Sequence, residues 1–329
     1  MRKAHKGKQN ILKYGIIALL VVFLVAGSLY LLQIWDEQRG KKPSFEISDD
    51  TLFYNGKEYI PNKNIETFLV LGLDKAEGQS QGDSYNNDKQ ADFLMLFVFD
   101  NSTKELSAIH INRDTMANVN VLGVAGDTID TVSKQIALAH TYGNGKGVSC
   151  RNTADAVSDL LLGVKVNHYI SLSLDSVAIV NDMVGGVEVE VLDDFSGIDY
   201  TLIKGETVTL MGEQALRYVR TRYGLDDSTN STRMKRQQQY INALYKKLGA
   251  CIEKDDEFIV DMSLKLADYI ESDRSVTRLQ ELAKKMDAYE FKGIKSPEGE
   301  SKMGEKFIEF YPDQNSIENL VVELFYKEK

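Results

Sequence analysis

Between Leu216 and Gln239 the chain carries arginines that could bind phosphate groups. Four of them are Arg220, Arg222, Arg233 and Arg236. A guanidinium group is planar, stays charged at physiological pH and can donate two parallel hydrogen bonds to phosphate oxygens. The whole protein has a formal net charge of −10, so this cluster runs against the overall charge. The segment therefore predicts a site for a diphosphate group.

Carboxylates that could hold a divalent cation stand at the ends of expected strands. Asp74 directly follows one apolar run, and Asp92 directly precedes the next. In α/β sheets, ligands bind beyond the carboxyl ends of the strands, and the start of an antiparallel neighbour reaches the same rim. Carboxylates hold Mg²⁺ together with water and phosphate oxygens. We therefore predict that Asp74 and Asp92 belong to a magnesium-assisted diphosphate site.

Further charged residues are expected at this rim. Arg113 and Asp114 follow a third apolar run. Residues two apart on a helix point in different directions, so Arg220 and Arg222 can face one site only where their helix ends, as Gly224 suggests. Each residue alone could equally be a solvated charge or a member of a surface ion pair. The prediction therefore depends on their clustering.

Apolar patterns predict the elements that must position these side chains. Uninterrupted apolar runs indicate strands covered on both faces, and apolar spacings of three and four indicate helices. The expected strands are 66–73, 93–99, 106–111, 169–172, 187–191 and 307–310. The expected helices are 133–140, 153–162, 175–183, 211–223, 234–248, 258–270, 276–289 and one from Ser316. This alternation predicts an α/β fold, a layered mixed β-sheet flanked by helices (α/β/α).

The N-terminal segment predicts a membrane anchor. Residues 14–34 are almost wholly apolar, and about 20 such residues span a bilayer. The basic residues before them are Arg2, Lys3, Lys6, Lys8 and Lys13. By the positive-inside rule the N-terminus is cytoplasmic and the rest of the chain is extracellular. A cleaved signal peptide is the alternative, but the apolar run continues past the small residues 26–28, which favours an uncleaved helix.

The expected organisation is a cytoplasmic basic tail (1–13), a transmembrane anchor (14–34), an extracellular stem (35–61) and one catalytic domain (62–329). Without the five basic residues before Tyr14, the formal charge of the chain is −15. Such an acidic domain is a poor candidate for sequence-independent binding of nucleic acid. Cys150 and Cys251 are the two cysteines, and spacing alone leaves open whether they pair. The histidines His110, His140 and His168 lack the spacing of a zinc site and are expected to be structural.

The motifs in their order along the chain resemble the LytR-CpsA-Psr family of membrane-anchored cell-wall enzymes. The resemblance covers about Ile65 to the C-terminus together with the single anchor. Matching segments are 72–74 (G-x-D), 90–92 (R-S-D in the family), 112–115 (P-R-D-T in the family), 182–187 (D-x-x-G-G-V), 212–222 (G-x-x-A-L-x-Y-x-R-x-R) and 233–238 (R-x-x-R-Q-Q). Such a series in register is far more specific than any one motif.

The resemblance implies an activity and a role for each matching residue. The family transfers glycopolymers such as wall teichoic acids or capsule from undecaprenyl-diphosphate carriers to peptidoglycan. By position, Asp74 and Asp92 are implied to hold Mg²⁺. The implied diphosphate ligands are Arg113, Arg220, Arg222 and Arg233, with Gln237 orienting part of the group. Asp114 is implied to position or deprotonate the acceptor hydroxyl, and it joins Arg113, Arg220 and Arg222 as the expected catalytic residues.

At three positions an uncharged residue stands in place of a charged residue of the family pattern. Gln90 stands in place of an arginine, Gln135 (or Lys134, if the alignment shifts by one) in place of a lysine, and Asn230 in place of an aspartate. A lost cationic contact costs on the order of 1.5–3 kcal/mol when it is buried and charge-assisted. The alternative function is therefore a protein that binds polyprenyl diphosphates or wall polymer as a scaffold, with weak or no catalysis.

Overall fold

The computed structural model describes residues 51–75, 87–222, 224–225, 230–255, 257–275, 278 and 288–329. The expected basic tail (1–13), the anchor (14–34), most of the stem and nearly all of the expected helix 276–289 lie outside these residues. Within the described ranges, no helix combines the length and the apolar composition needed to cross a membrane.

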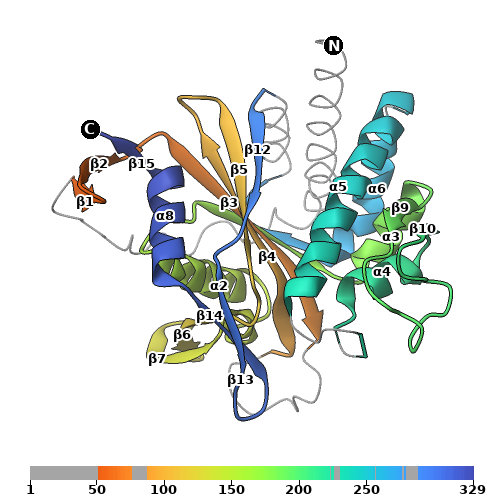
Figure 1. Ribbon diagram of the computed structural model, residues 1–329, viewed down its shortest axis with the longest axis horizontal. Helices are drawn as coiled ribbons and strands as arrows, with labels where there is room; N and C mark the ends of the chain where they lie inside the picture. Colours follow the sequence, from red (N-terminus) through yellow and green to blue (C-terminus); the bar gives the residue numbers. More distant parts are fainter. Residues whose placement is uncertain are drawn as a thin grey trace.

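A six-stranded mixed sheet forms the centre of the domain (Figure 1). Its strands, in spatial order, are β11 (Ile270–Ser272), β8 (His168–Ser173), β3 (Ile65–Lys75), β4 (Lys89–Asp100), β5 (Glu105–Ile111) and β12 (Glu290–Lys295). β3, β4 and β5 form an antiparallel meander, whereas β8 runs parallel to β3 and β12 runs parallel to β5. The predicted mixed sheet is therefore confirmed.

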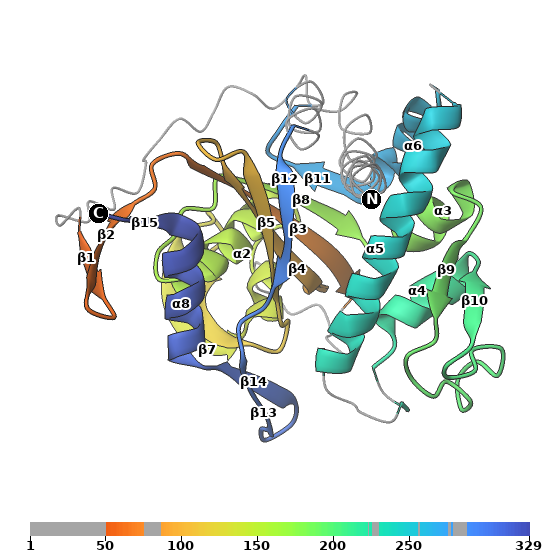
Figure 2. The same cartoon turned by 45° about the horizontal axis from the view of Figure 1, so that its top comes forward.

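Helices cover both faces of this sheet, as the continuous apolar runs predicted. Leu69 and Leu71 of β3 pack in one core with α2 (Gly147–Leu160) and α8 (Gln314–Phe325). Val70 lies on the opposite face, toward a group of four helices. These are α3 (Ser176–Met183), α4 (Glu213–Arg220), α5 (Asn230–Lys254) and α6 (Phe258–Leu266). Figures 1 and 2 show the two groups of helices on either side of the sheet.

Smaller sheets surround the central one. β1 (Leu52–Tyr54) and β2 (Lys57–Pro61) form a hairpin, and β2 also pairs with β15 (Tyr326–Glu328). Residues 52–61, which we assigned to the stem, therefore belong to the folded domain. The other two-stranded sheets are β6 (Met116–Leu122) with β7 (Thr128–Gln135), β9 (Val187–Glu190) with β10 (Thr207–Leu210), and β13 (Gly299–Met303) with β14 (Ile308–Pro312).

The expected helix over 133–140 is wrong in its first turn. Residues 133–135 complete β7, where they pair with β6, and a 3-10 helix, η2 (Ile136–Thr141), follows. The β-branched residues Thr128, Thr131 and Val132 suit a strand, and pairing with β6 outweighs the weak helical spacing. A second short 3-10 helix, η3 (Ala267–Tyr269), follows α6. The other predicted strands and helices within the described residues are present with shifted ends, whereas the prediction did not include β1, β2, β6, β10, β11, β12, β13 and β15.

The two cysteines are unpaired and lie on opposite sides of the sheet. Cys150 belongs to α2, whereas Cys251 belongs to α5. The Cys150 Sγ atom donates to Ser171 Oγ at 3.4 Å, and burial raises the pKa of its thiol to about 12. Cys150 is therefore a buried, protonated thiol that packs in the core, and the pairing alternative does not apply to this structure.

Two histidines are buried as neutral groups. His140 donates from Nδ1 to the carbonyl of Lys89 at 3.0 Å, and burial lowers the pKa of His140 to about 4. His110 lies in β5 beneath α5, where Gln238 contacts its Nδ1 at 3.1 Å. Burial, with a smaller contribution from the charge of Arg233, lowers the pKa of His110 to about 3. The sequence-based prediction that these two are structural agrees with their burial.

We expect the protein to lose stability as the pH falls below about 6.5, the ordinary pKa of histidine. In this range the unfolded chain binds protons at His110 and His140 while the folded chain does not, so the free energy of unfolding decreases. Each histidine should remove about 2 kcal/mol between about pH 7 and pH 5. Urea unfolding at both pH values measures the effect. His140→Gln should make the decrease smaller by its share, and an unchanged pH dependence in this variant would contradict the prediction.

Candidate functional site

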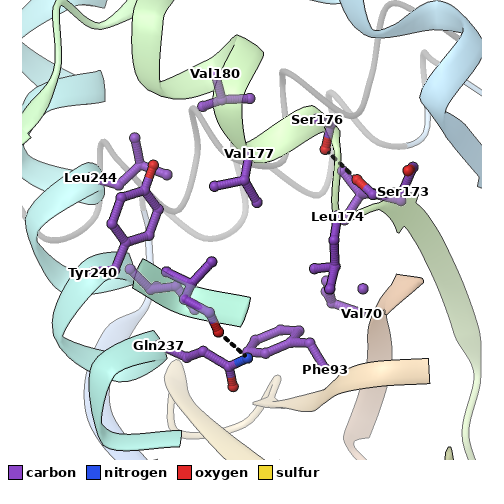
Figure 3. Close-up of a pocket in the computed structure, with 14 residues that line it drawn as sticks. Val70, Phe93, Ser173, Leu174, Ser176, Val177, Val180, Gln237, Tyr240 and Leu244 are labelled. Carbon is purple, nitrogen blue, oxygen red and sulfur yellow. Dashed lines mark hydrogen bonds between the residues drawn. The ribbon is translucent and has the colours of Figure 1, made fainter. Parts of the chain in front are cut away.

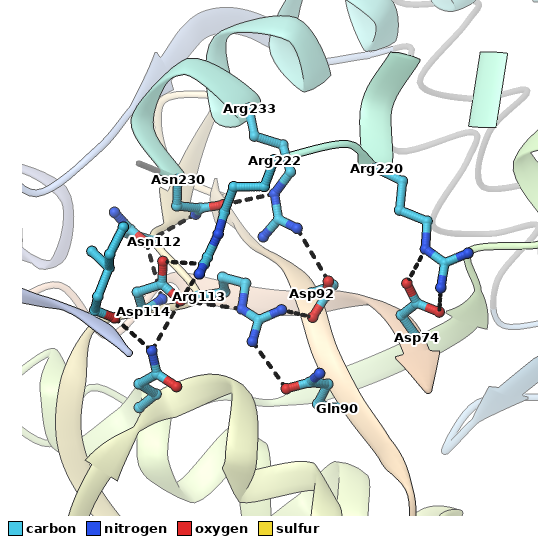
Figure 4. A network of polar contacts seen from close by, with 12 residues as sticks. Asp74, Gln90, Asp92, Asn112, Arg113, Asp114, Arg220, Arg222, Asn230 and Arg233 are labelled. Atoms are coloured by element: carbon cyan, nitrogen blue, oxygen red, sulfur yellow. Dashed lines mark hydrogen bonds and ion pairs between the residues drawn. The ribbon is translucent and has the colours of Figure 1, made fainter. Parts of the chain in front are cut away.

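Asp92 enters the site through a β-bulge. β4 carries one more residue than β3 at this point, and Asp92 is that extra residue. A bulge redirects side chains and is frequent beside functional sites. The carboxylate is only 6% exposed, yet it accepts hydrogen bonds from Arg113 at Oδ1 and from Arg233 at Oδ2, the latter at 3.1 Å. Asp92 thus holds two arginines that come from distant parts of the chain (Figure 4).

Asp114 is enclosed by donors in the turn after β5. Nη1 of Arg222 contacts both of its oxygens, at 2.7 and 3.0 Å, and Nε of Arg113 lies 3.3 Å from Oδ1. Gln135 donates to the same Oδ1 at 3.1 Å. With 1% of its surface exposed, the carboxylate is surrounded by groups that it orients.

The end of α4 directs two arginines to the sheet. Arg220 is the last residue of α4, and Thr221 has an extended backbone (ψ 133°), so Arg222 is outside the helix. Arg222 reaches Asp114, whereas Arg220 donates from Nη2 to Asp74 at 2.8 Å. The expectation that the helix ends here, so that both side chains turn toward one rim, is borne out.

Arg233 lies in the first turn of α5, and one of its hydrogen-bond donors is not satisfied within the described part of the chain. Its Nε donates to Asn230 Oδ1 at 2.7 Å, and its Nη1 to Asp92. Its Nη2 is buried, and no acceptor for it is found among the described residues. Burial lowers the pKa of Arg233 to about 10, so the group is still charged at neutral pH. A buried donor without an acceptor calls for a ligand or water.

Two other residues of this segment lie apart from the cluster. Arg236 is fully buried and donates to Asp193 and to the carbonyl groups of Tyr218 and Thr221. Its contacts join α5 to the end of α4, so it acts in folding, contrary to its grouping with the phosphate-binding arginines. Gln237 donates to the carbonyl of Val219 at 3.2 Å and points toward an apolar pocket.

This apolar pocket lies between the sheet and the helices α3, α4 and α5 (Figure 3). Its wall includes Val70, Phe93, Leu174, Val177, Tyr240 and Leu244. Gly72 also lines it, and a Cβ atom there would stand 2.8 Å from Leu174 and 2.9 Å from Phe93. Gln237 lies on α5 one turn after Arg233 and lines this apolar pocket. An apolar chain and a charged head group can therefore be held side by side.

The cluster carries a small positive excess. Arg113, Arg220, Arg222 and Arg233 bring four positive charges, and Asp74, Asp92 and Asp114 bring three negative ones. Buried arginines are tolerated because each has a carboxylate partner. The oxygens of an incoming diphosphate can replace those carboxylate oxygens as acceptors of the guanidinium hydrogen bonds.

The carboxylates fit a magnesium site in which the protein supplies two of the ligands. Among the described residues, no three His, Cys, Asp or Glu side chains gather as a metal cluster. Asp74 and Asp92 lie on adjacent strands at one end of the sheet, and two carboxylates satisfy Mg²⁺ when phosphate oxygens and waters complete its shell. The residues present therefore fit an ion that binds together with its phosphate ligand.

Sequence reasoning missed part of the network. Gln90 accepts from Nη2 of Arg113 at 2.9 Å, and Gln135, not Lys134, faces the site. Asn112, which we did not single out, accepts from the backbone N–H of Asp114 at 3.0 Å and from Asn230 at 2.8 Å. Its position two residues before Asp114 is the usual spacing of an asparagine that caps a turn, and this was the available signal.

Comparisons with known proteins identify a family and named relatives. A sequence model of the LytR_cpsA_psr family matches residues 35–324. A protein of Bacillus licheniformis named polyisoprenyl-teichoic acid–peptidoglycan teichoic acid transferase TagU is 27% identical over 259 residues, which cover 78% of this chain and 76% of that protein. A protein of the same name from Enterococcus faecalis is 27% identical over 239 residues, 71% of this chain and 69% of that protein.

Solved structures share the fold at low sequence identity. The crystal structure of Bacillus subtilis TagV gives a TM-score of 0.57 at 23% identity, covering 80% of this chain and 96% of that one. A structure described as TagT bound to LI-WTA gives a TM-score of 0.56 at 20% identity, covering 84% and 96%. These likenesses establish the α/β architecture.

We expect Arg222→Ala to lower the free energy of unfolding by about 3 kcal/mol, because it leaves the buried Asp114 carboxylate without its main partner. Arg217 provides the matched control. It pairs with Asp199 at 2.6 Å, but its side chain is 44% exposed. Arg217→Ala should cost about 0.5 kcal/mol or less, since surface ion pairs contribute little. Urea unfolding at neutral pH compares the two, and equal losses would show that the Asp114 pair is not a buried one in solution.

Proposed function

The chain belongs to the LytR_cpsA_psr family, and on that premise we propose that it is an extracytoplasmic phosphotransferase. It moves a glycopolymer from an undecaprenyl-diphosphate carrier to peptidoglycan. The observation that carries this proposal is the arrangement of four arginines and two metal-suited carboxylates beside an apolar pocket. The names of the TagU relatives, which are teichoic acid transferases to peptidoglycan, support the same class of reaction.

The arginines bind the diphosphate of the carrier. Arg233 offers its buried Nη2, and Arg113, Arg220 and Arg222 exchange carboxylate oxygens for phosphate oxygens. Asp74 and Asp92 would hold Mg²⁺, which supplies neutralisation of charge on the phosphate oxygens when it is bound. The polyprenyl chain lies in the apolar pocket, with Gln237 where the chain meets the head group.

Asp114 acts as a positioning residue in this scheme. Both of its oxygens accept from cationic or amide donors, and almost none of its surface is open to an acceptor hydroxyl. Of the two roles implied by the family resemblance, we therefore favour orientation of Arg113 and Arg222 over proton removal.

The transfer itself exchanges a phosphoanhydride bond for a phosphodiester bond. A sugar hydroxyl of peptidoglycan forms a bond to the phosphorus that carries the glycopolymer, and the bond between that phosphorus and the bridging oxygen breaks. Undecaprenyl phosphate departs with the bridging oxygen, and the hydroxyl proton leaves to solvent. The guanidinium groups stabilise the negative charge that gathers on the departing phosphate.

The anchor and location complete the proposal. Residues 14–34 are proposed to cross the membrane once with the N-terminus in the cytoplasm, so that the domain faces the wall where both substrates are found. The folded domain begins by residue 52, which keeps the site close to the membrane that holds the lipid carrier.

A second function has two observations in its favour. Gln90 stands where the family has an arginine, and its Oε1 accepts from Arg113 instead of adding a cation. Gln135 likewise offers an uncharged donor. A chain with fewer cationic contacts could bind a polyprenyl diphosphate or wall polymer without turnover, as a scaffold.

Purified full-length protein in detergent, given geranylgeranyl diphosphate and Mg²⁺, distinguishes the two functions. The enzyme should release phosphate, and Arg220→Ala or Asp92→Ala should reduce the rate by about a hundredfold or more. The first removes a cation that stabilises the departing phosphate, and the second removes a proposed Mg²⁺ ligand that also orients Arg113 and Arg233. Arg217→Ala, which changes an exposed ion pair, is the matched control and should keep the wild-type rate. Tight binding of the diphosphate with no release of phosphate would decide for the scaffold.

The apolar pocket leads to a separate prediction about binding of the lipid chain. Val177→Trp fills the pocket and should displace roughly 60 Å² of lipid contact, which weakens binding of geranylgeranyl diphosphate about tenfold. Binding of inorganic diphosphate should be unchanged, because its contacts are with the arginines. Val124→Trp, at a position that is 83% exposed, is the control. Equal weakening for both ligands in Val177→Trp would show that the pocket does not hold the lipid.

A further inference from the structure

Two buried asparagines join the sheet to the start of α5 inside the arginine cluster. Asn112 follows β5 directly, and Asn230 is the first residue of α5. Nδ2 of Asn230 donates to Oδ1 of Asn112 at 2.8 Å, although 118 positions separate the two residues. Both side chains are buried. Figure 4 shows the pair at one side of the network of arginines and aspartates.

Each asparagine also holds one charged residue of the site. Oδ1 of Asn112 accepts from the backbone N–H of Asp114 at 3.0 Å, so that it fixes the turn from which Asp114 projects. Oδ1 of Asn230 accepts from Nε of Arg233 at 2.7 Å. The result is a continuous neutral bridge from Asp114 to Arg233, and Arg233 in turn reaches Asp92.

The bridge requires amides at its centre. A side-chain amide donates through nitrogen and accepts through oxygen, whereas a carboxylate only accepts. An aspartate at position 230 could still receive Nε of Arg233, but it would turn an oxygen toward Oδ1 of Asn112. The family pattern has aspartate at this position and proline at position 112, where no side-chain oxygen stands. The two departures in this chain therefore compensate each other.

We propose that Asn112 and Asn230 are positioning residues that work as one unit. They fix the guanidinium of Arg233, so that its buried Nη2 faces the diphosphate, and they do so without adding a negative charge next to the ligand. The pair thereby leaves Asp92 as the carboxylate that Arg233 contacts. This inference rests on the proposed binding of a polyprenyl diphosphate, whose arginine ligands it concerns.

A cycle of variants in the full-length protein tests the pair, with geranylgeranyl diphosphate and Mg²⁺ as the probe. Asn230→Asp should weaken binding about tenfold, because it breaks the bridge and brings a negative charge to the ligand. Adding Asn112→Ala to Asn230→Asp removes the opposing oxygen and should recover part of the loss. Asn315→Asp, on the exposed first turn of α8, makes the same charge change and should bind as the wild type does.

Combination with Arg233→Ala separates positioning from a general loss of stability. If the pair acts through Arg233, Asn230→Asp should weaken binding less once Arg233 is alanine, because only the repulsion between the new carboxylate and the diphosphate then remains. The same further loss in both backgrounds, or binding within about twofold of wild type for Asn230→Asp alone, would overturn the inference. A wild-type chain that binds no polyprenyl diphosphate would overturn the proposed function as well, whereas binding without turnover would refute only the transferase.

Discussion

Compensation of buried arginines by a few carboxylates is the constraint on which this domain depends. Arg222 and Arg233 are nearly inaccessible to solvent, and each is held by an aspartate that is equally buried. Charges of this kind are tolerated only when their partners are close and well oriented. β4, the turn after β5, the end of α4 and the start of α5 must therefore meet at one place. The fold around the site is, in this sense, the arrangement that lets these charges coexist.

The same compensation prepares the site for exchange. The carboxylates occupy the positions that phosphate oxygens are proposed to take, so the guanidinium groups are already oriented before a ligand arrives. Binding then replaces one set of charge-assisted hydrogen bonds with another, and little side-chain entropy is lost. The apolar pocket beside Gln237 adds a different contribution to binding, because the free energy gained by burying a hydrocarbon chain is proportional to its contact area. Head group and chain can therefore be recognised by separate physical means.

The sequence predicts the parts of this structure that rest on strong, local signals. The apolar runs of β3, β4 and β5 mark buried strands, and the charged residues at their ends mark the rim. β7 and β13 are polar and largely exposed, so their pairing depends on contacts that no local pattern reveals. Within the site, Arg236 is indistinguishable in sequence from Arg233, and only the tertiary contact with Asp193 identifies it as structural. The bulge at Asp92 and the link from Asn112 to Asn230 likewise arise from register and long-range packing.

The small sheet of β1, β2 and β15 has a consequence for how the domain is completed during synthesis. Its ion pair between Lys57 and Glu328 spans 271 positions, and the last strand pairs with one of the first. Contacts between such remote segments close large loops and form slowly. Because the N-terminal end of the polypeptide is synthesised first, the edge of β2 that pairs with β15 stays unpaired until almost the whole domain has been made. A ribosome that stops early therefore releases a chain with an open strand, which exposes it to proteases and to aggregation.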